Sequence, residues 1–339
     1  MKRSAPTIKE IAKMLNLSVS TVSRALHSSS DISAATTKRV KDVAEELGYE
    51  PNQTALFLQS GRTLTLGVIL PHLSEAFFSE AISGIEDYAS EHNYNVLMGQ
   101  SHDSTEREKK IVEAMKNHRV DGILVSIAKN TKSFEHFDML KKYDIPVVYF
   151  DRVPERDDVH SVTCKLEEGV REAFEFLVKS NHTRIAFING PKELLATKER
   201  LNGYQRALKE MGVEFKPEYV VYSDLSAETT YRAMQKLLTL KPKPTAVIAF
   251  NDYVALDAIQ YARKMNVKIN EEISFLSFAN LQVCHYMENP PLASVEQFPY
   301  RQGQCATEML LEILAQKKNN GKSEGYRKVV LEPRLFIHK

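Results

Sequence analysis

The sequence has 339 residues, of which 43% are hydrophobic, so it is long enough for two or three domains and needs no disulfide or metal to stabilise its core. Lys and Arg number 45 against 44 Asp and Glu, and such a balance indicates no partner class, because DNA binding depends on local charge. Residues 1–63 carry a net charge of +3 and the remainder −2, the direction expected for an N-terminal DNA-binding segment.

Cysteine spacing and hydropathy exclude several classes of protein. Cys164, Cys284 and Cys305 are far apart and lack the spacing of a zinc site, so we expect three reduced core thiols and no metal. No run of about 18 apolar residues predicts a membrane span, and no apolar segment with a cleavage site follows the basic N-terminus. We therefore expect a cytoplasmic protein with no membrane partner.

The first fifty residues have the pattern of three short helices. Residues 7–10 form a capping box, and Ile8, Ile11, Ala12 and Leu15 then recur at helical spacing. Ser18 can cap a second helix, and a third begins near Ser33 and ends at Gly48. Two short helices joined by a tight turn predict a helix-turn-helix headpiece over residues 1–50.

The second helix has a polar face made of Ser20, Thr21, Ser23 and Arg24. Short hydroxyl side chains allow a close approach to phosphates, and an arginine here can pair with guanine O6 and N7. On periodicity alone, a three-helix unit with a solvated polar face explains the pattern equally well.

Residues 7–52 resemble the headpiece of the LacI/GalR family of bacterial repressors, chiefly through SVSTVSRAL at 18–26 and LGYEPN at 47–52. We count Thr7 among the DNA-binding residues, and His27 departs from the asparagine usual in the family. The resemblance implies base contacts by Val19, Ser20 and Arg24, and phosphate contacts by Thr21, Ser23 and Asn52.

A hinge is expected over residues 51–63, where Pro51 suits the start of a helix and Gly61 its end. About two helical turns are marginal on their own. The resemblance implies that hinge helices from two subunits fold on DNA and insert Leu58 into the minor groove, as an apolar wedge that kinks the duplex. The alternative is a flexible linker, and Leu56 departs from the arginine frequent in the family.

From residue 64 onward, strand and helix patterns alternate. The strands are expected at 66–70, 96–98, 122–126, 147–150, 185–188, 220–222, 246–250, 273–276 and 329–337. Helices are expected between them, among them 77–92, 104–118, 131–143, 227–240 and 300–317. Two series of β/α units predict an α/β fold of two doubly wound subdomains of periplasmic-binding-protein type. We expect 64–160 with 292–322 in the N-subdomain, and 161–291 with 323–339 in the C-subdomain.

Ligands of such sheets bind at the carboxyl ends of the strands, and two facing lobes form a cleft. Polar and aromatic residues follow several predicted strands, and Arg200 lies in the helical segment after 185–188. Alternatively, the phenylalanines belong to the core, Asp151 and Arg152 form a structural ion pair, the Asn251–Asp252 pair caps a helix, and Arg200 is a surface residue. The candidates selected by position are Phe77, Phe78, Asp151, Arg152, Arg200, Asn251 and Asp252.

This core also resembles periplasmic sugar-binding proteins, and the resemblance adds Gln297 to the candidate effector-binding residues. It implies a sugar or sugar derivative as effector, since aromatic faces pack on sugar rings and polar side chains bind hydroxyls. Three positions depart from the pattern: Ala279 replaces an acid, Leu225 an aromatic residue, and Glu75 an asparagine.

Taken together, these patterns predict a transcription regulator, most simply a repressor, whose affinity for a near-palindromic operator on double-stranded DNA is controlled by a small molecule. No leucine heptads follow the last strand, so we expect a homodimer. A pure solute-binding protein is the second hypothesis, and the headpiece argues against it. An enzyme is the third, but no catalytic or dinucleotide motif occurs, so we expect neither catalysis nor a cofactor.

Overall fold

The computed structural model describes residues 6–50, 61–318 and 325–338, and the chain divides into two compact units, Met1–Thr63 and Leu64–Lys339. The first unit contains three helices, α1 (Ile8–Leu15), α2 (Val19–Leu26) and α3 (Ala34–Leu47). Thr7, Ser18 and Ser33 cap them, and Gly48 ends α3 with a φ of 61°. The predicted headpiece helices are thus confirmed.

The small core of the headpiece explains the orientation of α2. Ile11, Val22, Ala25 and Val40 are fully buried and bring the three helices together. Because Val22 and Ala25 point inward, the opposite side of α2 faces outward. The predicted hinge residues Asn52, Leu56 and Leu58 lie outside the described residues.

Replacing Thr7 with alanine should destabilise the headpiece by about 1 kcal/mol. The Thr7 hydroxyl accepts the Glu10 backbone N–H, while the Glu10 carboxylate accepts the Thr7 N–H at 2.7 Å. Hydrogen exchange of the α1 amides in the full chain measures the loss. The exposed neighbour Lys9, changed to alanine, is the control, and equal protection in both variants would contradict a stabilising cap.

The second unit contains two six-stranded sheets, each in its own lobe. The first sheet has the order β11-β5-β4-β3-β1-β2, all parallel. Its strands are β1 (Thr65–Leu70), β2 (Asn95–Gln100), β3 (Gly122–Val125), β4 (Val147–Phe150), β5 (His160–Cys164) and β11 (Lys328–Leu331). One face packs on α5 (Ala76–Glu91) and α12 (Pro299–Lys318), and the other on α6 (Thr105–Asn117), α7 (Glu135–Asp138) and the 3-10 helix η1 (Met139–Tyr143).

The second sheet has the order β12-β10-β9-β8-β6-β7, and only the β10–β12 pair is antiparallel. Its strands are β6 (Ile185–Asn189), β7 (Val220–Tyr222), β8 (Ala246–Ala249), β9 (Ser274–Phe278), β10 (Ala293–Glu296) and β12 (Arg334–Ile337). Two cores flank it, one with α8 (Leu166–Lys179) and α9 (Leu195–Glu210), the other with α10 (Ala227–Thr239) and α11 (Asp252–Lys264). Short 3-10 turns η2 (Pro217–Tyr219) and η3 (Gln282–Tyr286) complete this lobe, and the predicted fold class is confirmed.

The structure corrects the predicted boundaries of the two lobes. β5 belongs to the first sheet and β10 to the second, so the expected divisions at 160/161 and 291/292 are displaced. The expected strand 329–337 is two strands, β11 in the first sheet and β12 in the second. Pro333 separates them, because proline cannot donate a ladder hydrogen bond. The expected helix 131–143 begins only at Glu135.

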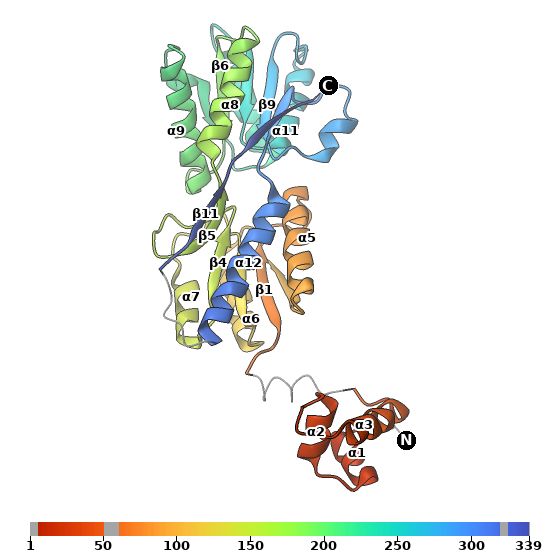
Figure 1. Cartoon of the computed structure of the whole chain (residues 1–339). Helices are drawn as coiled ribbons and strands as arrows, with labels where there is room; N and C mark the ends of the chain where they lie inside the picture. The colour runs from red at the N-terminus through yellow and green to blue at the C-terminus, as the bar shows by residue number, and fades with distance from the viewer. Residues whose placement is uncertain (1–5, 51–60, 319–324, 339) are drawn as a thin grey trace. The chain divides into compact units, whose positions relative to one another are not determined.

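The helices α5 and α12 pack side by side in the first lobe (Figure 1). Two glycines permit this, since a Cβ at Gly84 would lie 2.0 Å from the Tyr300 carbonyl oxygen, and one at Gly303 2.1 Å from that of Ala81. Phe77 and Phe78 of α5 and Gln297, which lies two residues before α12, line the candidate site, so the close packing of the two helices helps to position these residues.

Candidate functional site

The outward side of α2 presents the residues predicted to contact DNA. Val19 is 42% exposed, Ser20 and Arg24 are exposed, and Thr21 and Ser23 are half-buried. The Arg24 guanidinium lies 3.9 Å from the Asp31 carboxylate, and both side chains are largely exposed. A loose surface pair of this kind contributes little and leaves the guanidinium available to another partner.

Three hydroxyl groups cluster at the start of α2. The Ser18 Oγ lies 2.8 Å from both Ser20 Oγ and Thr21 Oγ1, and it also accepts the Thr21 backbone N–H. Helix N-termini with unsatisfied N–H groups and short hydroxyl side chains are suited to bind phosphate. The predicted residue Thr7 is exposed, but its hydroxyl already serves the capping box of α1.

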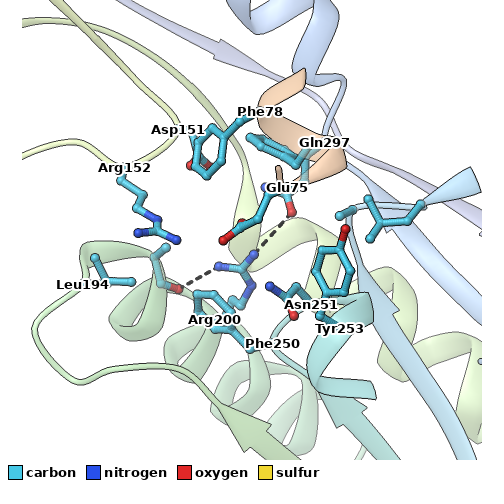
Figure 2. A pocket seen from close by; sticks show the side chains of 14 residues that line it. Glu75, Phe78, Asp151, Arg152, Leu194, Arg200, Phe250, Asn251, Tyr253 and Gln297 are labelled. Carbon is cyan, nitrogen blue, oxygen red and sulfur yellow. Dashed lines mark hydrogen bonds between the residues drawn. The ribbon is translucent and has the colours of Figure 1, made fainter. Parts of the chain in front are cut away.

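A pocket lies between the two lobes of the second unit, and its empty space, including the part open to solvent, is about 520 Å³ (Figure 2). The first lobe contributes residues from the start of α5 and the end of β4, and the second contributes residues from α9, the end of β8 and the segment after β9. Its lining residues are Glu75, Phe77, Phe78, Asp151, Arg152, Leu194, Ala196, Arg200, Phe250, Asn251, Tyr253, Ala279, Leu281 and Gln297.

Arg200 is the most deeply buried charge of this pocket, with 3% of its surface exposed. Its guanidinium carbon lies 4.2 Å from the ring centroid of Phe250 and 4.4 Å from that of Phe278. Nη2 donates to Gln297 Oε1 at 3.3 Å, whereas Nε is buried without a partner among the described residues. Burial lowers the pKa of Arg200 to about 10. The aromatic rings therefore hold a cation whose hydrogen bonds are incomplete.

Asp151 and Arg152 are adjacent but do not pair with each other within the described structure. Arg152 Nη1 donates to Asp103 Oδ1 at 2.7 Å, and Asp151 accepts the Ser126 hydroxyl at 3.2 Å. Asp151 has a φ of 57°, a conformation that turns the chain sharply after β4 and is common at binding sites. Burial raises the pKa of the Asp151 carboxyl, while Arg152 and Arg200 oppose that rise.

Asn251 and Asp252 have different positions, although they are neighbours. The Asn251 side chain caps α11 by accepting the Val254 N–H at 2.9 Å, and Asn251 also lines the pocket. Asp252 is fully buried and is not a lining residue, contrary to the expectation of a ligand contact. Its carboxylate accepts the Leu281 N–H and the Ser294 hydroxyl, each at 2.5 Å, and the Ser277 hydroxyl. Those bonds fix the segment after β9, which carries Ala279 and Leu281.

The other predicted residues lie where strand ends were expected to bring them together. Phe77 and Phe78 are buried core residues whose surfaces also line the pocket. Gln297 lies between β10 and α12 and is 5% exposed. Leu225 packs against the core of the second lobe and is not a lining residue.

Several lining residues were not among the predicted site residues. Phe250 and Tyr253 flank Asn251, so the strand-end rule could have found them, whereas Leu194 and Ala196 carry no signal of this kind in the sequence. Glu75 and Ala279 were noted only as departures from the family pattern. Seven of the eight predicted residues do line the cavity, the exception being Asp252.

Neither a candidate metal cluster nor a membrane-spanning helix is found in the described ranges. Among residues 6–50, 61–318 and 325–338, no cluster of His, Cys, Asp or Glu side chains could hold a metal ion. No helix in those ranges has the length and hydropathy of a membrane span. The three cysteines are buried and unpaired, as predicted.

Comparison with known proteins assigns both units to one family. Residues 7–52 match the model of the lacI family of bacterial regulatory proteins, and residues 63–339 match periplasmic binding proteins and the sugar binding domain of the LacI family. The chain is 31% identical to the transcriptional repressor PurR of Vibrio vulnificus over 93% of each sequence. It is 32% identical to catabolite control protein A of Priestia megaterium, over 91% of this chain and 92% of that one.

A solved structure agrees with this assignment. The complex of the transcriptional regulator CelR with cellobiose superposes with a TM-score of 0.73 at 27% identity, covering 98% of both chains. The exposed face of α2 and the pocket between the lobes thus occur in a chain whose full length is matched by relatives of one kind. The protein belongs to the LacI family of bacterial regulatory proteins, DNA-binding regulators controlled by small-molecule effectors.

Proposed function

We propose that the protein is a cytoplasmic, homodimeric repressor whose affinity for a near-palindromic operator is set by a sugar or sugar derivative bound between its lobes. One observation carries this proposal: a single chain combines an outward polar face on a helix-turn-helix with a polar and aromatic pocket in a separate unit. A dimer would align two recognition helices with two operator half-sites.

The outward residues of α2 supply the two kinds of contact that DNA recognition needs. Arg24, Val19 and Ser20 would face base edges, since a guanidinium forks onto guanine and small side chains allow close approach. Thr21 and Ser23 would contact phosphates together with Thr7. Asn52 and Leu58 keep their proposed roles in the hinge, as a phosphate contact and a minor-groove wedge.

The pocket offers what a small polar ligand requires. Phe77 and Phe78 provide apolar faces, while Asp151, Arg152, Arg200, Asn251 and Gln297 provide donors and acceptors. The CelR relative was solved as a cellobiose complex, which supports a carbohydrate as the ligand class. Asp252 would act by holding the pocket wall and not by contacting the ligand.

The two lobes also contact each other directly, and a bound ligand could strengthen or weaken these contacts. Lys129 Nζ in the first lobe donates to the Asp224 carbonyl oxygen in the second at 2.8 Å, and Lys198 pairs with Glu155. A ligand that favours one arrangement of the lobes shifts operator affinity only by its differential affinity, typically about 1–3 kcal/mol.

Replacing Arg24 with alanine tests the DNA-binding role directly. We expect the free energy of operator binding to fall by about 1–3 kcal/mol, with relaxed base preference at one position of each half-site. Selection from a randomised duplex pool defines the operator. Titration of that operator with the wild type and with Arg24→Ala gives the two affinities. Arg24→Lys is the control, because it keeps the charge and removes the bidentate fork. Unchanged affinity and unchanged base preference in Arg24→Ala would overturn the assignment.

A further inference from the structure

Glu75 is a carboxylate in the pocket that no structural role explains. It occupies the position before α5, but its side chain makes no capping bond, unlike the side chains that cap α1, α2, α3, α6, α10 and α11. The helices α7, α8 and α9 also lack a side-chain cap. Its carbonyl oxygen accepts hydrogen bonds from Ser79, but its carboxylate takes part in no hydrogen bond or ion pair with the residues that the structure describes. Figure 2 shows the Glu75 carboxylate directed into the pocket interior.

The charges that line the pocket are equal in number, but Glu75 has no partner among them. Arg152 and Arg200 bring two positive charges, and Glu75 and Asp151 bring two negative ones. Arg152 is already bound to Asp103 at 2.7 Å, and Asp103 lies behind the lining residues. Asp103 also lies 3.6 Å from His72, and the Arg200 guanidinium donates to Gln297, so within the described residues no cation is paired with the Glu75 carboxylate.

An unpaired carboxylate is costly in this partly buried position. Burial raises the pKa of the Glu75 carboxyl, and the nearby Asp103 and Asp151 add to the rise, although Arg152 and His72 oppose it. A carboxylate that is partly desolvated and lacks a partner is destabilising unless a cation or a hydrogen-bond donor reaches it. Such a cost is typical of a side chain that serves binding and not folding.

A protonated amine meets the need of the Glu75 carboxylate for a positive charge and for hydrogen-bond donors better than a hydroxyl group does. An ammonium group supplies three donors and a charge opposite to that of Glu75, whereas a hydroxyl supplies one donor and leaves the carboxylate without a counter-charge. The discrimination is largest in a confined pocket, because a low local dielectric strengthens the attraction between opposite charges. Arg200 and Gln297 remain available to the uncharged oxygens of the same ligand.

Building on the proposed function, we propose that Glu75 selects an effector that carries a protonated amino group on a polyhydroxylated skeleton, such as an amino sugar, over the corresponding hydroxyl compound. Glu75 is then a specificity-determining residue of the effector pocket, and the ligand ammonium is the partner that the carboxylate lacks.

Matched pairs of ligands test this inference on the full-length protein. The pairs are glucose with glucosamine, galactose with galactosamine, and mannose with mannosamine, and the two members of each pair differ at one group. Each compound is titrated at a pH below the pKa of the amine while thermal unfolding of the protein is followed. For at least one pair, we expect the amino sugar to bind the wild type about 30-fold or more tightly than its hydroxyl counterpart, as for a desolvated charge pair.

Glu75→Gln removes the charge and keeps the shape of the side chain, so it should abolish that preference. Glu86→Gln is the matched control, because Glu86 is an exposed residue of the same helix and should leave the preference intact. The inference is overturned if both members of every pair bind alike, including no binding at all, or if Glu75→Gln still prefers the amine.

Operator binding of the wild type, measured without ligand, separates this inference from the proposed function. A protein that selects a specific duplex but shows no preference for an amine refutes only the role of Glu75. A protein that selects no duplex sequence refutes the proposed function, whatever the ligands do.

Discussion

Arg200→Met should abolish the response to every small molecule that stabilises the wild type while leaving the protein at least as stable. Arg200 is buried between two phenylalanine rings, its hydrogen bonds are 3.3 and 3.4 Å long, and its Nε lacks a partner among the described residues. An apolar side chain of similar length can fill that space without the desolvation cost of a guanidinium, and such replacements are often neutral or stabilising. The ligand, in contrast, would lose the donors that complete its binding.

Thermal unfolding with the panel of sugars and amino sugars measures both effects. The loss of ligand affinity should reach at least about 100-fold, as for a desolvated charge in a binding site. Arg206→Ala is the matched control, since Arg206 lies on the same helix, is exposed, and pairs with Glu167 at 2.9 Å. If Arg200→Met folds stably and ligands still stabilise it as they do the wild type, the effector binds elsewhere.

Asp252→Ala should destabilise the second unit by about 3 kcal/mol or more, because it strands buried donors in a region that water does not reach. The lost acceptor serves the Leu281 N–H and the hydroxyls of Ser277 and Ser294, and Asp252 itself is fully buried. Chemical denaturation of the full-length protein, followed by circular dichroism, gives the change in the free energy of unfolding.

We expect Asp252→Ala to lower the free energy of unfolding, whereas replacing a residue that contacts the ligand would lower ligand affinity. Asp257→Ala on the same helix should cost less than about 1 kcal/mol, since the Asp257 carboxylate is only half-buried and accepts none of the buried donors described above. If Asp252→Ala unfolds like the wild type and loses only ligand binding, its carboxylate contacts the ligand after all.

Much of the candidate site followed from where residues stand in the chain. Asp151, Arg152 and Asn251 each follow a buried strand, and the strand-end rule brings them to one cavity without knowledge of the tertiary fold. The rule failed at Asp252, because consecutive residues at the start of a helix point in different directions. Asn251 faces the pocket, and Asp252 turns toward the serines of β9 and β10.

The partner of Arg152 could not have been predicted from sequence. Its neighbour Asp151 was one expected partner, but the guanidinium reaches Asp103, forty-nine residues earlier in the chain. The same limit applies to Glu75, whose lack of a partner is visible only when every side chain around the cavity is in place.

The sequence by itself determined the features that arise from local interactions: the capped helices of the headpiece, the outward face of α2, and the alternation of strands and helices from residue 64. These depend on neighbours a few residues apart, where periodicity and capping act directly. Only the tertiary structure decided which lobe receives β5, β10 and β11, and how the charges of the pocket are paired. Strand order and charge pairing arise from contacts between segments far apart in the chain, and hydrophobic periodicity carries no information about which of several buried strands will be neighbours.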